Sequence, residues 1–387
     1  MSPYMVKTVK TRALKSLLLP LVAASGLSLS QQALSFSDVL DTPAVKSSKA
    51  VESLLLDIDR LNGGRLVASG ERGHILYSDD NGKSWVQSDV PVIVNIIAAD
   101  FVSDTTGWAV GHDGVVLKTT DGGESWIRQF DGFKANEQTL IQRQKFVEAL
   151  EAQLEEASDD EIEDLEFALE EAQFSLEDAQ FDLEGGSTKP FLDVWFKDEN
   201  TGIIVGAYGQ MFQTTDGGAT WNNIASRLDN PDRFHLNAIV DVQPGSLVVV
   251  GEAGLIMRST DEGATWETLE SPYDGSFFGA VSTRQLNGLL VYGLRGHVFR
   301  SSDLGDSWEE IEVNTEQTLN SGRAFKDGTI MLVGNNGVVL KSYDSGRNFT
   351  TTVREDRSSL VGIEESKDGG IVLVGQDGLY LALPNAE

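Results

Sequence analysis

The chain has 387 residues, enough for two average domains or for one large all-β domain. It contains no cysteine, which excludes disulfides, thiolate metal sites, a thiol nucleophile and a lipid anchor on cysteine. Its 60 acidic and 30 basic residues give a formal net charge of −30, which argues against nucleic-acid binding because that affinity comes mainly from neutralised phosphates.

The first 35 residues have the pattern of a secretory signal peptide. Four bases precede an apolar stretch at 17–29, and Ala33-Leu34-Ser35 forms a small-x-small cleavage site. The alternative is an uncleaved membrane anchor, but the apolar run has about 13 residues and contains Pro20, whereas a span needs about 20. We expect cleavage after Ser35, a periplasmic location and, because no acid is removed, a mature net charge of −34.

A Gly-x-x-Gly pair followed by a short apolar segment recurs along the chain. The copies begin at Gly70, Gly111, Gly206, Gly251, Gly293, Gly334 and Gly375. Their intervals are 41, 95, 45, 42, 41 and 41 residues, so about 54 extra residues follow the second copy. A repeat of about 41 residues with four short apolar runs is typical of a four-stranded propeller blade. The sequence therefore predicts an all-β fold, a seven-bladed β-propeller of four-stranded antiparallel blades.

Six copies continue into an Asp-box, Ser/Thr-x-Asp-x-Gly-x-Ser/Thr-Trp. In this motif the Asp accepts backbone N–H groups across a tight turn, the Gly takes a positive φ, and the Trp packs between sheets. The boxes lack the regular oxygen-ligand spacing of calcium loops, so we interpret them as structural. The predicted structural residues are Asp80, Trp85, Asp121, Trp126, Asp216, Trp221, Asp261, Trp266, Asp303, Trp308, Asp344 and Phe349.

The seventh copy ends before a fourth strand. Its strands are expected at 360–363, 371–374 and 379–383, whereas the first copy has four, near 54–58, 65–68, 75–78 and from Ser84. Residues 41–50 precede the first strand and are able to supply the missing one. We therefore expect N-terminal strand closure, which would remove an open sheet edge.

The extra residues between Trp126 and the strand expected at 191–196 have a helical pattern. Residues 135–184 contain no Pro or Gly, and apolar residues repeat with 3-4 spacing at Ile162, Leu165, Leu169, Ala172, Leu176, Ala179 and Leu183. A less regular series runs from Leu140 to Ala157. Ser158–Glu161 indicates a capping box, and Gly185-Gly186 indicates a helix end. We expect an antiparallel α-helical hairpin whose second helix has roughly 26 residues.

Phe167, Phe174 and Phe181 form a second stripe that the hairpin seam does not need. The stripe lies on the outer side of the second helix. It either packs on the propeller or on the first helix, or it is a docking surface for a partner or a second copy. Residues 132–187 carry 17 acids and 3 bases, a net charge of −14.

The Gly-x-x-Gly loops and the hairpin are expected on one face of the propeller, with the Asp-boxes on the other. Equivalent loop positions hold Arg72, Asp113, Tyr208, Ala253, Arg295, Asn336 and Asp377, which form no coherent catalytic set. His74 and His297 occupy equivalent positions in non-adjacent blades and do not suggest a metal pair. No nucleophile elbow or phosphate loop is present. We predict no catalytic residue, no metal site and no cofactor.

The repeats, the secretory start, the last copy without a box, and the strands in FLDVWFKDENTGIIVGAYGQMFQTTDGGATW resemble the photosystem II stability and assembly factor propellers. The resemblance covers about 41–383 apart from the hairpin. It implies a non-enzymatic chaperone that holds membrane-protein intermediates through an arginine patch. On the loop face, Arg72 and Arg295 are the residues that would stand in such a patch. This chain differs in its acidity, its hairpin and its lack of an N-terminal cysteine.

We therefore expect an assembly or accessory factor for a membrane complex of the cell envelope, related to a transporter or to a photosystem. The candidate partner-binding residues are Arg72, Tyr208, Arg295, Phe167, Phe174 and Phe181. The alternative is a glycan-binding or glycoside hydrolase propeller of sialidase type, although the usual Arg-Ile-Pro start is absent. The expected organisation is a signal peptide at 1–35, two blades with the closing strand at 36–131, the hairpin at 132–188, and five blades at 189–387.

Overall fold

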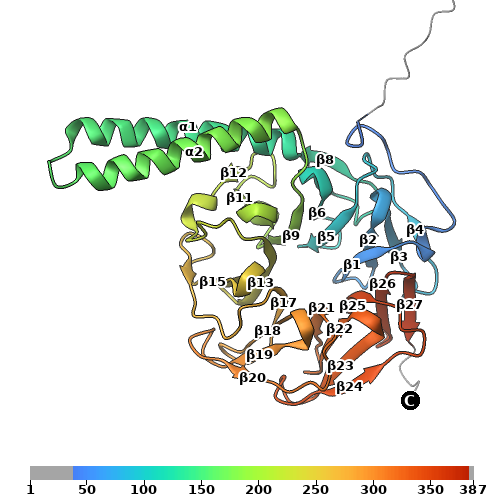
Figure 1. Ribbon diagram of the computed structural model, residues 1–387. Helices are drawn as coiled ribbons and strands as arrows, with labels where there is room; N and C mark the ends of the chain where they lie inside the picture. The colour runs from blue at the N-terminus through green and yellow to red at the C-terminus, as the bar shows by residue number, and fades with distance from the viewer. Residues whose placement is uncertain (1–37, 383–387) are drawn as a thin grey trace, which may run out of the picture. The chain divides into compact units, whose positions relative to one another are not determined.

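The computed structural model describes residues 38–382, so the predicted signal peptide at 1–35 lies outside the described residues. Within this range the strands form seven antiparallel sheets, six with four strands and one with three. Figure 1 shows the sheets arranged around a central axis. The predicted seven-bladed propeller with an inserted helical hairpin is confirmed.

The strands follow the blades in chain order, with the first strand of each blade innermost. Blades 1 to 3 contain β1 (Leu55–Arg60), β2 (Leu66–Gly70), β3 (Ile75–Ser78), β4 (Val86–Gln87), β5 (Ile96–Phe101), β6 (Gly107–Gly111), β7 (Val116–Thr119), β8 (Ile127–Phe130), β9 (Phe191–Phe196), β10 (Gly202–Gly206), β11 (Met211–Thr214) and β12 (Asn222–Asn223). Blades 4 to 7 contain β13 (Leu236–Gln243), β14 (Ser246–Gly251), β15 (Ile256–Ser259), β16 (Glu267–Thr268), β17 (Phe277–Ser282), β18 (Leu289–Gly293), β19 (Val298–Ser301), β20 (Glu309–Glu310), β21 (Leu319–Ala324), β22 (Ile330–Gly334), β23 (Val338–Ser342), β24 (Thr350–Val353), β25 (Leu360–Glu365), β26 (Ile371–Gly375) and β27 (Gly378–Ala382).

The inner strands pack against one another around the ring. Each of them contacts the inner strand of the next blade, and β25 of the last blade contacts β1 of the first. Large apolar side chains fill the spaces between blades, as where the buried Trp108 ring stacks on Phe196 with centroids 3.5 Å apart. The hydrophobic core is therefore a ring of contacts between sheets, and every blade depends on both of its neighbours.

The Asp-box turns are closed by their carboxylates. In blade 3, the Thr220 N–H donates to Asp216 Oδ1 at 2.8 Å, and the Thr214 hydroxyl donates to the same oxygen at 2.9 Å. Trp221 is 2% exposed and meets Phe196 edge-on. A backbone N–H four residues on also donates to Asp80, Asp121, Asp261, Asp303 and Asp344. Each box thus ties the turn to its own strand and points its aromatic residue toward a neighbouring sheet.

The predicted N-terminal strand closure is wrong, because the last sheet consists of β25, β26 and β27 alone within the described residues. Residues 38–46 instead lie alongside the segment that links blades 1 and 2. The Ala44 N–H donates to the Val90 carbonyl at 3.0 Å, and the Ile93 N–H donates to the Val39 carbonyl at 3.1 Å. Leu40 is 3% exposed in the apolar cluster of this segment, so burying its side chain draws the N-terminal residues away from the last blade.

A short 3-10 helix, η1 (Ala50–Glu52), then reaches the last blade without adding a strand. Ala50 and Val51 belong to the same apolar cluster as Leu379 of β27. Gly378 has a φ of +89°, and a Cβ there would lie 2.0 Å from the Val51 carbonyl oxygen. This close approach requires glycine and covers one end of the β27 edge.

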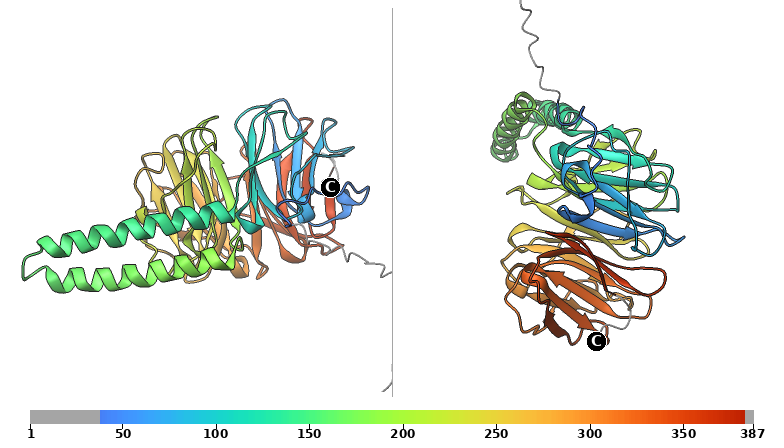
Figure 2. Two further views of the ribbon diagram at one scale, coloured as in Figure 1. Left: turned by 90° about the horizontal axis from the view of Figure 1, so that it is seen from above. Right: turned by 90° about the vertical axis from the view of Figure 1, so that its right-hand side faces the viewer.

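Two helices form the inserted hairpin, α1 (Gly132–Glu156) and α2 (Ile162–Gly185). Val147, Leu150 and Ala172 are buried in the seam between them. The second helix has 24 residues rather than roughly 26, and begins at Ile162. The Ser158 side chain and N–H both donate to the Glu161 carboxylate before this start. Figure 2 shows the two helices side by side, projecting beyond the sheets. No helix in residues 38–382 has the length and apolar character needed to cross a membrane.

The burial of Leu40 leads to a stability prediction. Leu40→Ala should lower the free energy of unfolding by about 2–5 kcal/mol, because it leaves a cavity between blades 1 and 2. Val45→Ala is the matched control, since Val45 lies in the same segment and is 67% exposed; it should change stability by less than about 0.5 kcal/mol. Denaturant unfolding measures both, and equal effects would contradict the observed path of the N-terminal segment.

Candidate functional site

The inner strands enclose a central channel of about 830 Å³. Three carboxylates in its wall each accept a backbone N–H from the next blade. Asp57 Oδ2 accepts from Ala99 at 2.8 Å, Asp100 Oδ2 accepts from Phe196 at 2.6 Å, and Asp193 Oδ2 accepts from Ile239 at 2.8 Å. These side chains therefore join blades 1 to 4 from inside the ring.

Burial in the channel wall makes these three carboxyl groups hard to ionise. It raises the pKa of Asp57 to about 6, of Asp193 to about 7 and of Asp100 to about 8. The nearby charges of Asp59 and Asp193 add to the rise in the Asp100 pKa, and the Phe196 N–H opposes it. Of the three carboxyl groups, Asp100 therefore has the pKa raised furthest from its usual range.

An ion-pair cluster, in which Glu364 is buried and Arg323 is partly exposed, joins blades 6, 7 and 1. Nη2 of Arg323, on β21, lies 2.8 Å from Asp59 Oδ1 of β1 and 2.6 Å from Glu364 Oε2 of β25. Burial raises the pKa of Glu364, while the Arg323 charge opposes that rise. The two carboxylates come from the blades that meet where the ring closes, so Arg323 bridges this closure.

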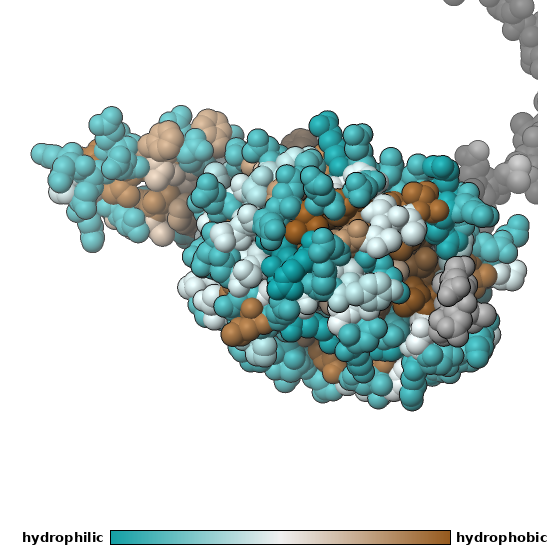
Figure 3. All heavy atoms as spheres, turned by 90° about the horizontal axis from the view of Figure 1, so that it is seen from below, coloured by the Kyte–Doolittle hydropathy of each residue, from teal (hydrophilic) through white to brown (hydrophobic). Residues whose placement is uncertain are grey.

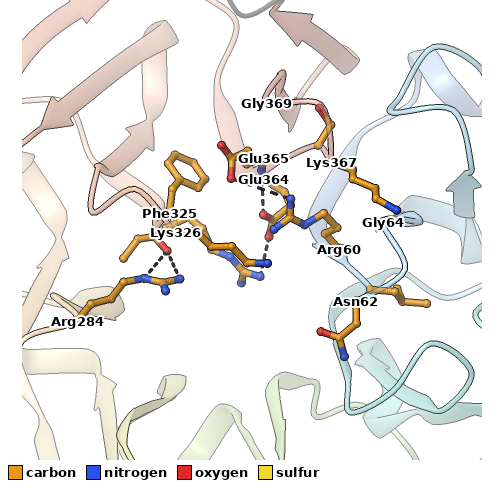
Figure 4. Close-up of a pocket in the computed structure, with 14 residues that line it drawn as sticks. Arg60, Asn62, Gly64, Arg284, Phe325, Lys326, Glu364, Glu365, Lys367 and Gly369 are labelled. Carbon is orange, nitrogen blue, oxygen red and sulfur yellow. Dashed lines mark hydrogen bonds and ion pairs between the residues drawn. The ribbon is translucent and has the colours of Figure 1, made fainter.

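Basic side chains gather at one end of the channel, beside the turns that follow the first strands of blades 1, 5, 6 and 7. Figure 4 shows this cavity of about 440 Å³, which we call the cationic mouth. It is lined by Arg60, Arg284, Arg323, Lys326 and Lys367, with Glu364 and Glu365.

Some of these cations have carboxylate partners and others do not. Arg60 lies 4.0 Å from Glu365, whereas Arg284 donates from Nε and Nη2 to the Ala324 carbonyl, and Lys367 donates to the Gly63 carbonyl. The ion pairs within residues 38–382 include none made by Arg284, Lys326 or Lys367. The mouth therefore offers uncompensated positive charge to a carboxylate or a phosphate.

The three loop residues predicted to bind a partner are exposed but lie apart. Arg72, Tyr208 and Arg295 belong to blades 1, 3 and 5, and each has a positive φ, of 56°, 58° and 58°. The cavity lined by Arg295 and the cavity lined by Tyr208 are separate, and Arg72 lines neither of them. Tyr208 instead faces the hairpin base, with the Lys189 ammonium 5.4 Å from its ring.

Sequence reasoning missed the cationic mouth, although the repeats contained a signal for it. Aligned blades place bases at or just after the end of the first strand, in Arg60, Arg284, Arg323, Lys326 and Lys367. The resemblance implies an arginine patch on the Gly-x-x-Gly loops instead. The structure brings together the residues of a different turn, at the other end of the blades.

The aromatic stripe of the hairpin is open to solvent. Phe167, Phe174 and Phe181 are 67%, 57% and 75% exposed, so none of them packs on the propeller or on α1. The interpretation in which the stripe covers the propeller flank is therefore wrong.

The histidines singled out in the sequence have local partners. His74 is buried, which lowers its pKa, and His297 lies 2.9 Å from Glu310 and against the Tyr273 ring. Across residues 38–382 no group of three or more His, Asp or Glu side chains is arranged to hold a metal ion.

A family model described as Photosynthesis system II assembly factor YCF48 matches residues 173–275. The chain resembles these photosystem II assembly factors. This confirms the resemblance inferred from the repeats, and the match spans the second half of α2 and all of blades 3 and 4.

Solved structures show the same fold at low sequence identity. A structure of YCF48 bound to D1 peptide is 15% identical, with a TM-score of 0.59, covering 89% of this chain and 99% of that one. YCF48 from Cyanidioschyzon merolae is 14% identical, with a TM-score of 0.58 and coverages of 86% and 96%. A streptogramin B lyase is 12% identical, with a TM-score of 0.62 and coverages of 90% and 100%. A search among curated proteins found no match.

The channel carboxylates lead to a pH prediction. Because their pKa values are raised, the folded state binds more protons than the unfolded state between about pH 4 and pH 8, so stability should fall as pH rises. Each group contributes a slope of up to about 1.4 kcal/mol per pH unit. Asp100→Asn keeps an acceptor for the Phe196 N–H and should flatten the slope between pH 5 and pH 8. Denaturant unfolding at several pH values checks this.

The control is Asp160→Asn at the exposed hairpin turn, which should leave the slope as it is. An Asp100→Asn protein with the same pH dependence as the original chain would show that Asp100 ionises normally in the channel.

Proposed function

We propose that this propeller is a non-enzymatic binding protein, an assembly or accessory factor that holds an acidic segment of a partner protein at the cationic mouth. The observation that carries the proposal is the gathering of Arg284, Lys326 and Lys367, without carboxylate partners, in a chain of net charge −30. The resemblance to YCF48, which has been seen with a bound D1 peptide, supports a peptide as the ligand.

Charge would make such a mouth selective. The net negative charge of the protein repels an acidic segment, whereas the positive electrostatic potential at the mouth attracts it. A partner carboxylate would bind side chains from several blades, because the lining cations come from different blades. Their positions are set by the inner strands and their turns, which makes the site pre-organised.

The setting of this activity is part of the proposal. The signal-peptide pattern supports secretion to the periplasm. The resemblance to assembly factors supports a membrane complex of the envelope as the partner, as the sequence analysis expects.

The glycoside hydrolase alternative is less well supported. Such enzymes need two carboxyl groups that flank an accessible glycosidic bond. Asp57, Asp100 and Asp193 instead use an oxygen each to bind the backbone of the next blade. This structural role explains their position without catalysis.

Neutralising the mouth tests the proposal. Arg284→Gln/Lys326→Gln/Lys367→Gln should reduce capture of a membrane-complex partner from detergent-solubilised membranes by roughly 10-fold, because each lost charge pair contributes roughly 0.2–1 kcal/mol. Quantitative mass spectrometry of the captured proteins measures this. The charge-matched control is Arg72→Gln/Arg295→Gln/Lys49→Gln, which should retain the partner. Loss in the control alone would move the binding site to the loop face.

A panel of aryl glycosides tests the alternative function. We expect no release of the aryl group from any of them at pH 5 to pH 8. Hydrolysis that disappears in Asp100→Asn, while the variant still folds, would establish an enzyme.

A further inference from the structure

Helix α2 presents its aromatic stripe along the side opposite the hairpin seam. Successive Phe residues are seven positions apart, or about 10 Å at 1.5 Å per residue, so the stripe from Phe167 to Phe181 is about 21 Å long. The seam is filled by other residues, among them Leu169, Ala172 and Leu176. Figure 3 shows apolar side chains gathered on the hairpin among hydrophilic ones. The stripe therefore contributes little to holding the two helices together.

Acidic residues border the stripe. Residues three and four positions apart lie next to each other on a helix, so Phe174 is flanked by Glu170, Glu171, Glu177 and Asp178. The same spacing places Glu163 and Asp164 beside Phe167, and Glu184 beside Phe181. Within its 24 residues α2 has nine acids and no base. The stripe is thus an apolar row inside a strongly negative surface.

The base of the hairpin is fixed to the propeller. Within the hairpin, the Asn136 side chain of α1 donates to the Asp182 and Gly186 carbonyls, both at 2.9 Å, which ties the two helices together at the base. The Asn223 side chain of blade 3 donates to the Thr139 hydroxyl at 2.9 Å. Arg233, which precedes blade 4, forms an ion pair with Asp178 at 2.9 Å. These contacts hold α2 in one orientation, so a partner would meet a pre-organised helix.

The charge decides which occupant fits. A second copy would bring two hairpins of net charge −14 together, and an anionic lipid surface would likewise be repelled. An apolar segment without charge would leave the flanking carboxylates uncompensated. A segment with apolar residues between rows of Lys or Arg satisfies both parts of the surface.

We infer that the outer face of α2 docks a basic amphipathic helix of a partner protein. Its apolar residues, at about seven-residue spacing, lie against Phe167, Phe174 and Phe181, and its Lys or Arg residues pair with the flanking Glu side chains, since Asp178 is already paired with Arg233. This site is separate from the cationic mouth and goes beyond the proposed function. The mouth would bind an acidic segment of a partner, whereas the hairpin would bind a basic helix.

The test uses a fluorescent 21-residue peptide with two Leu and five Lys in each heptad, titrated with the intact protein at physiological salt. Phe167→Gln/Phe174→Gln/Phe181→Gln should weaken binding at least 10-fold, with a melting temperature within about 2 °C of the original because the three side chains are exposed. A scrambled peptide of the same composition should bind at least 10-fold more weakly than the heptad peptide. These two results separate helix docking from general attraction between opposite charges.

A pair of charge-matched variants tests the acidic border. Glu163→Gln/Glu170→Gln/Glu171→Gln/Glu177→Gln on α2 should weaken binding at least 10-fold and reduce its salt dependence. Glu148→Gln/Glu151→Gln/Glu155→Gln/Glu156→Gln on α1 makes the same charge change away from the stripe and should weaken binding less than 3-fold. Equal effects of the two sets, or full binding by the Phe variant, would overturn the inference.

Two further measurements distinguish other occupants. Sedimentation should show no self-association, and vesicles of phosphatidylglycerol and phosphatidylcholine should not bind; a dimer or a vesicle complex that is lost in the Phe variant would overturn the inference. The mouth variant Arg284→Gln/Lys326→Gln/Lys367→Gln should bind the Leu/Lys peptide as the original chain does. The two proposals can therefore fail independently. Loss of partner capture at the mouth would not change peptide binding by the hairpin, and loss of peptide binding would not change partner capture at the mouth.

Discussion

Each blade is held by the two blades beside it, and this arrangement works only if the ring closes where β1 meets β25. No strand is shared across that point within the described residues. Apolar packing of β1 on β25 and β26 closes the ring, and Arg323 adds ion pairs to Asp59 of β1 and Glu364 of β25. Removing Arg323 would leave the carboxylate of Glu364 buried without a cation beside it.

Closure also explains the chemistry of the channel. The inner strands converge on the axis, where the side chains of Asp57, Asp100 and Asp193 are partly buried. Carboxylates in that position are tolerated because backbone N–H groups of the next blade bind them and because some hold a proton near neutral pH. The channel is therefore part of the scaffold, and its open end, where cations collect, is the part suited to a ligand.

The molecule separates its charges by position. Uncompensated bases lie at the turns between first and second strands, whereas the inserted hairpin, between β8 and β9, is acidic. An insertion is tolerated at that point because a connection between blades lies outside the sheets. The fixed base and the self-contained seam let the hairpin project without weakening the ring. Two sites of opposite charge on one rigid scaffold suit a protein that holds different segments of its partners.

The sequence by itself determined the blade number, the strand positions, the Asp-boxes and the hairpin, because those features depend on residues close together in the chain. Strand Phe191–Phe196 lies where its pattern predicts, and α2 ends at the expected glycines. The path of residues 38–50 and the cationic mouth were decided by tertiary structure alone. Leu40 is buried in the apolar cluster between blades 1 and 2, and that cluster exists only in the folded ring. Arg284 and Lys367 are far apart in the sequence and line one cavity only after the seven sheets have closed into a ring.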